Sequence, residues 1–249
     1  MTVVDDWSNL FAMDLESTNA PNPGNPVSAD GSGIARGYGS RSVDDSASES
    51  VAAAPGGDAK ERILAAGAKL VGEKGFNGCG LNEILQLAAV PKGSFYHYFA
   101  SKEDFGVALI ERARDAYLIS LRAILGDRRR TAVQRLRAVF EQTREECAQS
   151  GPTVECIIPK LALETANLSE PVHAAVRCVY QQWSALLAQA IREGQAAGEI
   201  DRRHDADRLA NVLVMMWEGA AIRMQIDRSV QPLDDFLTFV FDSLLGDMA

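Results

Sequence analysis

Two short helices separated by a proline break constrain the fold of this chain more than any other feature. Between residues 81 and 102 the sequence reads LNEILQLAAVPKGSFYHYFASK. The apolar residues of the first helix follow the i, i+3, i+4, i+7 spacing of a face that packs on a core: Leu81, Ile84, Leu85 and Ala88. Proline disfavours helical geometry in the preceding residue, so the turn ends at Val90 and a second helix begins at Pro91. The spacing predicts a helix-turn-helix.

The second helix carries aromatic residues on one side and polar tips on the other. Phe95 and Phe99 are four residues apart, which predicts that both face the core. The side chains on or near the opposite face are of types that reach DNA: Lys92, Ser94, Tyr96 and His97. Glycine inside a helix costs about 1 kcal/mol relative to alanine, so Gly93 calls for a reason. Close approach of a phosphate or a base is one such reason.

The run VPKGSFYHYFASKEDF is similar to the recognition helix and the following linker of TetR-type transcriptional regulators. This resemblance extends from Lys60 to about Leu245. It implies a helix-turn-helix transcriptional regulator, a homodimer that binds a palindromic double-stranded DNA operator. The residues implied to contact DNA are Lys92, Gly93, Ser94, Tyr96 and His97. The resemblance further implies that Lys102, at the start of the next long helix, approaches a phosphate.

Two positions depart from the family pattern. Many members carry Thr or Ser just before the first motif helix, where the hydroxyl caps the helix, but this chain has Cys79 and Gly80 there. Asn82 is the alternative cap. The usual glycine of the turn is replaced by Ala89.

The periodicity predicts helices throughout, so the fold class is all-α. Residues 59–105 are expected to form a three-helix DNA-binding head, and residues 106–249 a ligand-binding and dimerisation domain. Helices are expected at about residues 58–73, 101–125, 131–149, 169–197, 205–226 and 233–245, with a kinked or broken helix around Pro159. The run Leu209 to Met224 is apolar almost all round, which favours a subunit interface in the last two helices.

Residues 1–58 are expected to form a disordered acidic tail, because their Ser, Gly, Asp and Pro content leaves little apolar surface to bury. The net charge of the chain is −9. Residues 1–59 contain nine acids and two arginines, so most of the acidity belongs to the tail. No stretch has the ~18 uninterrupted apolar residues of a membrane span, and the first residues do not resemble a secretory signal. A cytoplasmic protein without membrane contact is expected.

The four cysteines are widely spaced and form no C-x-x-C pair, so reduced thiols are expected, without metal or cofactor. An enzyme could pair Cys156 with His173, or Glu164 with Glu218. No nucleophile elbow, phosphate loop or metal spacing accompanies these residues, so no catalytic residue is assigned.

Within the family, the runs GLNEILQLAAVPKGSFYHYFASKEDFGVALIER and CIIPKLALETANLSEP are most similar to electrophile- and acrylate-responsive repressors. Cys156 resembles the reactive cysteine of that branch, which implies release from the operator by a reactive electrophile or oxidant. Lys160, four residues on, would lower the pKa of Cys156 if both lie on one helical turn. A lysine of that branch is replaced by Gln225, which argues against oxidation chemistry that needs a nearby amine.

Two alternatives remain open at this level. The first is a repressor of an efflux or catabolic gene, released by a non-covalent effector between the helix that begins at Ser101 and the helix that carries Trp217. The second is a protein-binding adaptor, because the head is close to neutral.

Overall fold

The computed structural model describes residues 58–150, 157–165 and 169–245. Within these ranges the elements are helical, and no strand occurs. The expected all-α class is therefore confirmed. Apart from Asp58, the acidic tail lies outside the described residues. No helix in the described ranges is long and apolar enough to cross a membrane.

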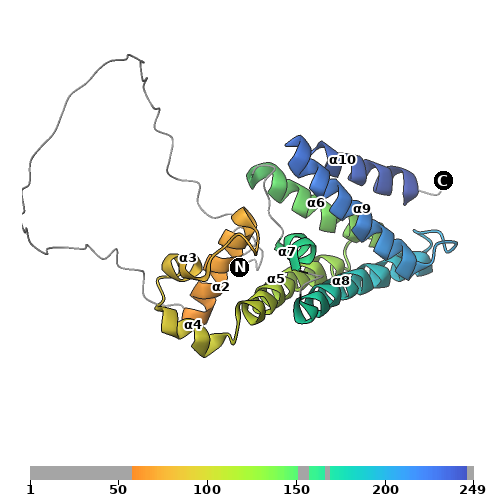
Figure 1. Cartoon of the computed structure of the whole chain (residues 1–249). Coiled ribbons are helices and arrows are strands. Elements are labelled where there is room, and N and C mark those ends of the chain that lie inside the picture. The colour runs from red at the N-terminus through yellow and green to blue at the C-terminus, as the bar shows by residue number, and fades with distance from the viewer. Residues whose placement is uncertain (1–57, 151–156, 166–168, 246–249) are drawn as a thin grey trace, which may run out of the picture. The chain divides into compact units, whose positions relative to one another are not determined.

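Three helices form the head (Figure 1): α2 (Ala59–Lys74), α3 (Leu81–Leu87) and α4 (Lys92–Tyr98). Asp58 caps α2 by accepting a hydrogen bond from the Lys60 backbone N–H, at 3.2 Å. Gly75 ends α2 with a φ of 77°, a left-handed conformation that favours glycine. Both ends of this helix follow the predicted signals.

The turn between α3 and α4 keeps its left-handed residue although no glycine is present. Ala89 adopts a φ of 50°, which costs a residue with a Cβ roughly 1–2 kcal/mol. Arg62 compensates by donating to the carbonyls of Ala88 and Ala89, each at 3.4 Å. Pro91 is the extended N-cap of α4, so the helix begins one residue later than predicted.

The predicted cap of α3 by Asn82 is wrong. The N-cap is Gly80, which has an extended backbone and no capping side chain. Asn82 is the second residue of the helix, inside its first turn, whereas a capping side chain comes from the residue just before the helix. The exposed start of α3 thus presents backbone N–H groups without a side-chain partner.

The core of the head continues into the helices that follow it. These are α5 (Lys102–Leu125), α7 (Ile157–Thr165) and α8 (Glu170–Ala197). Phe95, Phe99 and Phe105 pack with ring centroids 5.1–5.7 Å apart. The same buried cluster includes these residues of α7 and α8: Ile158, Leu161, Val172, Val176 and Val179. The head therefore shares its hydrophobic core with α5, α7 and α8.

The remaining helices are α6 (Ala132–Ser150), α9 (Ala206–Asp227) and α10 (Gln231–Thr238), which together with α5, α7 and α8 are called the regulatory helices below. They enclose a second core in which Phe140, Trp217 and Phe236 meet with centroids 4.9–5.1 Å apart. After α10 the chain forms a π-helical segment, η1 (Phe239–Leu244), which the apolar spacing did not predict. The expected kink at Pro159 is also absent from α7: the proline is the third residue of the helix, where a missing N–H leaves no intrahelical bond unmade.

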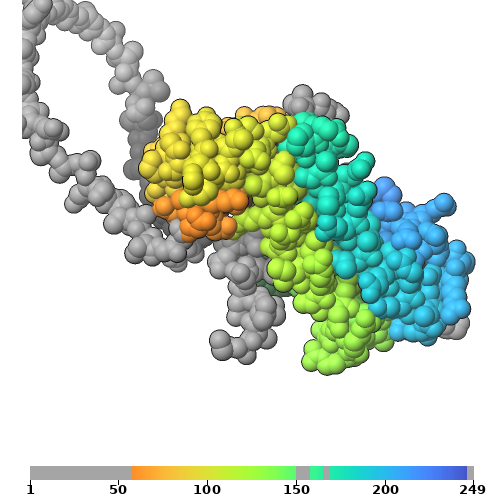
Figure 2. Space-filling model, turned by 90° about the horizontal axis from the view of Figure 1, so that it is seen from below, coloured from red at the N-terminus to blue at the C-terminus, as the bar shows by residue number. Residues whose placement is uncertain are grey.

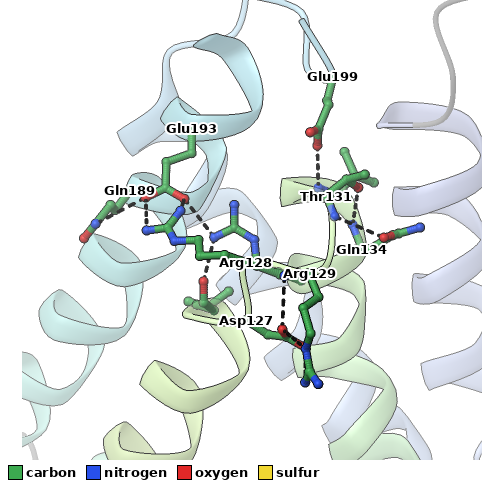
Figure 3. A network of polar contacts seen from close by, with 11 residues as sticks. Asp127, Arg128, Arg129, Thr131, Gln134, Gln189, Glu193 and Glu199 are labelled. Carbon is green, nitrogen blue, oxygen red and sulfur yellow. Dashed lines mark hydrogen bonds and ion pairs between the residues drawn. The ribbon is translucent and has the colours of Figure 1, made fainter. Parts of the chain in front are cut away.

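A polar network joins the junction of α5 and α6 to α8 (Figure 3). Arg135 is 5% exposed and donates to the Leu125 carbonyl at 2.6 Å and to the Glu193 carboxylate at 2.8 Å. Arg128 donates to the same carboxylate through both terminal nitrogens, at 2.5 and 3.0 Å. The arginine run 128–130 is surface-exposed, and Arg128 also makes this structural contact. At the start of α6, Thr131 and Gln134 form a reciprocal capping box.

We expect Glu193→Ala to lower the free energy of unfolding by about 2–3 kcal/mol, because Arg135 would remain buried with only a carbonyl partner. Hydrogen bonds from Arg128 and then Arg135 lower the pKa of Glu193 to about 2, from an ordinary value of 4.5. A lowered folded-state pKa means that the stabilisation is complete above the unfolded pKa and is lost as pH falls towards 2.

Urea titrations from pH 7 to pH 3 test this expectation. The difference between wild type and Glu193→Ala should be constant above about pH 4.5 and shrink below it. Glu141→Ala, which removes an exposed carboxylate paired with Arg137, is the control and should cost under about 0.5 kcal/mol. Equal losses for the two variants would contradict a special role for the buried arginine.

Candidate nucleic-acid interface

The outer face of α4 presents the side chains that the sequence singled out. Lys92 and His97 are exposed, Tyr96 is 59% exposed and Ser94 is half-buried. Phe95 and Phe99 are 0% and 2% exposed, so the helix is anchored as predicted. Figure 2 shows residues of this segment, in yellow, at the surface beside α5. The helix thus presents one ammonium, one phenol and one imidazole on its outer face, while buried phenylalanines hold its inner face in place.

Gly93 is exposed, and a Cβ built on it would meet nothing within 4 Å. It lies inside α4 and has no positive φ. Neither packing nor backbone conformation within the chain therefore requires glycine here. A group outside the chain that approaches the backbone closely would explain it.

Lys102 has an internal role that sequence reasoning missed. Its ammonium donates to the carbonyls of Phe76 at 2.8 Å and Cys79 at 2.7 Å, and lies 4.9 Å from the centroid of the Phe76 ring. These contacts tie the loop between α2 and α3 to the start of α5. Two of the three ammonium N–H groups are used, which leaves one for the phosphate contact implied by the resemblance.

The basic groups of the head differ in their availability. Lys74 is paired with Glu83, and Arg112 with Glu61 at 2.6 Å. Lys92, in contrast, makes no ion pair or side-chain hydrogen bond with the described residues. An unpaired surface ammonium is available for a phosphate or a base without first breaking an internal contact.

Of the three residues proposed for the effector site, the structure describes Lys160 and Trp217, and their contacts lie in different parts of the fold. Cys156 lies outside the described residues. The Lys160 ammonium, on α7, donates to the Gly72 carbonyl of α2. Trp217 is 6% exposed and packs in the second core against Phe140 and Phe236.

The described cysteines differ in accessibility. Cys79 and Cys147 are buried, and desolvation raises the pKa of both thiols, that of Cys147 to about 11. Neither has the electropositive, accessible surroundings of a reactive thiolate. Cys178 is half-buried, and its sulfur accepts a hydrogen bond from the Gln182 side chain at 3.0 Å.

Several polar side chains are buried or half-buried between the helices that follow the head. A small cavity of about 10 Å³ between α5 and α6 is lined by Tyr117 and Glu146, among others, which is space for one water molecule. Desolvation raises the pKa of Glu146, and it raises the pKa of Glu218 on α9 to about 7, against a hydrogen bond from Tyr180. The indole N–H of Trp183 is buried and has no hydrogen-bond partner among the described residues. Trp217 does not line this cavity.

Of the two residue pairs considered for catalysis, the structure describes both members of one, Glu164 and Glu218, and these have different partners. Glu164 accepts a hydrogen bond from the Asn77 backbone N–H at 2.8 Å, whereas Glu218 is bonded to Tyr180. His173 lies 3.7 Å from Glu170 on its own helix, and Cys156 is outside the described residues. Among the described residues, no three or more His, Cys, Asp or Glu side chains gather as metal ligands would.

An apolar stripe on α9 is a second surface, and no other part of the described chain covers it. Met215, Ile222 and Ile226 are 63%, 47% and 68% exposed, and spacings of seven and four residues place them on one side of the helix. Gly219 lies on the same side, and a Cβ added to it would meet nothing within 4 Å. Phe239, in η1, is 53% exposed. Large apolar side chains grouped in this way indicate a protein contact surface.

Comparison with known proteins gives matches in both parts of the chain. Residues 63–109 match the tetR family of bacterial regulatory proteins, and residues 132–240 match the tetracyclin repressor-like C-terminal domain. The HTH-type transcriptional repressor NemR of Escherichia coli strain K12 is 38% identical over 183 residues, 74% of this chain and 92% of that protein. Transcriptional regulator AcuR of Cereibacter sphaeroides is 39% identical over 180 residues, 72% of this chain and 81% of that protein. The crystal structure of the reduced form of E. coli NemR has a TM-score of 0.73 at 36% identity, covering 78% of this chain and all of that one.

Proposed function

The chain belongs to the TetR family of bacterial regulatory proteins, a family of transcriptional regulators rather than enzymes, and from this premise we propose that it represses transcription by binding a palindromic operator as a homodimer. The observation that carries the proposal is the outer face of α4. There Lys92, Tyr96 and His97 are exposed, and the helix is anchored from behind by Phe95 and Phe99. A recognition helix needs this combination, because its polar tips must enter the major groove while its position stays fixed.

The proposed contacts divide into two kinds. Lys92 and the backbone near Gly93, at the N-terminal end of α4, approach phosphate, since the helix dipole favours an anion there; the Ser94 hydroxyl is the further donor, because the Ser94 backbone N–H is bonded to the Pro91 carbonyl. Tyr96 and His97, one turn further along, reach base edges. Lys102 supplies a further phosphate contact through its remaining N–H group.

The proposal of a homodimer is supported by the apolar stripe on α9. A two-fold axis through this face would bring Met215, Ile222 and Ile226 against the same residues of a second copy, with Gly219 permitting close approach. Two heads spaced by about 34 Å would then read adjacent turns of a palindrome.

Binding of this chain to the DNA upstream of its own gene tests the proposal directly. Fluorescence anisotropy with a labelled duplex should give a saturable curve that is resistant to unlabelled non-specific DNA, with two chains per operator by sedimentation. Equal affinity for the upstream duplex and for a scrambled duplex would instead favour the protein-binding adaptor.

The effector of this repressor is proposed to be a reactive electrophile or oxidant that modifies Cys156. This cysteine directly precedes α7 in the sequence, and its setting resembles the reactive cysteine of electrophile-responsive relatives. The E. coli relative is described in a reduced form, which supports a thiol-based trigger. The Lys160 ammonium donates to the Gly72 carbonyl. It would lower the pKa of the Cys156 thiol only if it also approached that thiol while keeping, or after leaving, this contact.

A second candidate is a non-covalent effector, which a different observation favours. Two polar groups lie in α8 and α9: the buried Trp183 N–H, which has no hydrogen-bond partner among the described residues, and the Glu218 carboxyl, with a pKa of about 7. Both groups are suited to hydrogen-bond a polar ligand. Such a ligand would lower the affinity for the operator without any thiol chemistry.

Treatment with N-ethylmaleimide separates the two candidates. We expect the reagent to release wild-type protein from its operator and to leave the Cys156→Ser variant bound, as measured by anisotropy. Cys178→Ser is the control for the half-buried thiol and should be released like the wild type. Release of Cys156→Ser at the wild-type concentration of reagent would remove Cys156 from the mechanism.

A further inference from the structure

Two side chains of α7 hold the connection between α2 and α3, the segment that leads into the helix-turn-helix. The Lys160 ammonium donates to the Gly72 carbonyl, 88 residues away in sequence. One helical turn later, the Glu164 carboxylate accepts a hydrogen bond from the Asn77 backbone N–H at 2.8 Å, 87 residues away. Figure 1 shows α7 as a short helix near α2, α5 and α8. Helix α7 thus contacts the last turn of α2, at Gly72, and the connection itself, at Asn77.

Each backbone group that α7 contacts carries a partial charge opposite in sign to that of the α7 side chain it bonds. Gly72 belongs to the last turn of α2, where carbonyl groups without intrahelical partners favour a cation such as the Lys160 ammonium. The Asn77 N–H lies outside any helix and bonds to an ionised acceptor, which makes a stronger bond than a neutral one. Both contacts therefore have a clear electrostatic basis.

Gly75 provides the space for the Glu164 carboxylate. A Cβ on Gly75 would lie 2.1 Å from Glu164 Oε1, well inside contact distance. The φ of 77° at Gly75 brings the connection into this position. Any side chain at residue 75 would displace the carboxylate, so this glycine has a role in the contact besides ending α2.

The same connection is held from its other side by α5, through Lys102. On α7 itself, Ile158 and Leu161 are buried in the core of the head, while Leu163 is 80% exposed. The polar contacts of α7 therefore fall on the head, and its apolar contacts join the head to α5 and α8. A displacement of α7 would be transmitted to the α2–α3 connection.

We propose that α7 positions the DNA-binding head, and that Lys160 and Glu164 act as positioning residues for operator binding. The inference rests on the proposed function, because operator binding is the activity that these residues serve. A head held in one orientation loses less conformational freedom when the dimer binds a palindrome than a head that moves on α5. Loss of either contact weakens operator binding although neither residue touches DNA.

Glu164→Ala is the test variant, measured without any effector. The dissociation constant for the upstream duplex should rise about five- to tenfold, which is less than the full value of a charge-assisted hydrogen bond in each head, because the lost contact only orients the head and does not touch DNA. Glu164→Gln keeps a carbonyl oxygen for the Asn77 N–H and should recover most of the affinity. Glu199→Ala is the matched control: it removes a carboxylate that accepts from the Val133 backbone N–H at 3.1 Å, within the regulatory helices, and should leave operator affinity unchanged.

Amide hydrogen exchange at Asn77 provides a readout that does not depend on DNA. Exchange should accelerate in Glu164→Ala and remain close to wild type in Glu164→Gln. Faster exchange together with unchanged operator affinity would overturn the positioning role, and so would unchanged exchange. If the wild type bound no operator, the proposed function would fail, and exchange alone would then decide whether α7 holds the connection.

Discussion

Replacing Lys92 and Tyr96 together by alanine is expected to weaken operator binding by a hundredfold or more. Each head loses one unpaired ammonium and one exposed phenol, so a dimer loses four side-chain contacts, and each base or phosphate contact is typically worth about 1–3 kcal/mol. The log–log slope of affinity against salt concentration should decrease by about two units per dimer, since one phosphate contact is lost in each head. Anisotropy titrations at several salt concentrations measure both quantities.

Two controls separate a loss of contacts from a loss of structure. Both side chains are exposed, so the melting temperature of the double variant should match that of the wild type. Arg129→Ala removes an equal positive charge on the loop before α6, where the side chain is 89% exposed, and should leave the operator affinity within about twofold of wild type. Unchanged affinity in the Lys92 and Tyr96 double variant would refute the assignment of α4 as the recognition helix.

Ile222→Glu is expected to convert the protein into a monomer and, as a result, to reduce operator affinity by about a hundredfold or more. In an isologous interface the substitution introduces two carboxylates close to the two-fold axis, which must be desolvated near one another. A monomer also loses the gain in operator affinity that comes from linking two heads, which is typically about 10²- to 10⁴-fold. Sedimentation velocity should show a species near the chain mass of 26.9 kDa in place of twice that mass.

Ile119→Glu is the matched control for this experiment. Ile119 is an isoleucine on α5 that is 62% exposed and lies outside the α9 stripe. The same change of charge there should preserve the dimer and the operator affinity. A dimer that survives Ile222→Glu, or that is lost equally in Ile119→Glu, would place the subunit interface elsewhere.

Much of the local structure followed from short-range signals. Ser101, Ser169 and Asp205 were predicted to begin helices, and each accepts a hydrogen bond from the backbone N–H three residues later. Gly198 was predicted to end α8 and adopts a φ of 78°. These features are readable because a cap and its partner lie within one turn of the chain. The candidate DNA-contact residues on α4 could be predicted for the same reason. The helical period places each side chain on a face of the helix, and that face depends only on residues within a few positions.

The sequence by itself determined the helical fold class, the anchoring of α4 by Phe95 and Phe99, and the side chains that α4 exposes, because helical period and capping act over three to seven residues. Only the tertiary structure decided what the long polar side chains bind. Lys102 holds the loop before α3, and Arg135 is buried on Glu193. Lys160 holds the last turn of α2 at Gly72, and Glu164 holds the α2–α3 connection at Asn77. The partners in these contacts are 23 to 88 residues apart, and several are backbone atoms that every residue possesses. No residue pattern marks such a partner, so the contacts that link the head to the regulatory helices emerge only when the chain is folded.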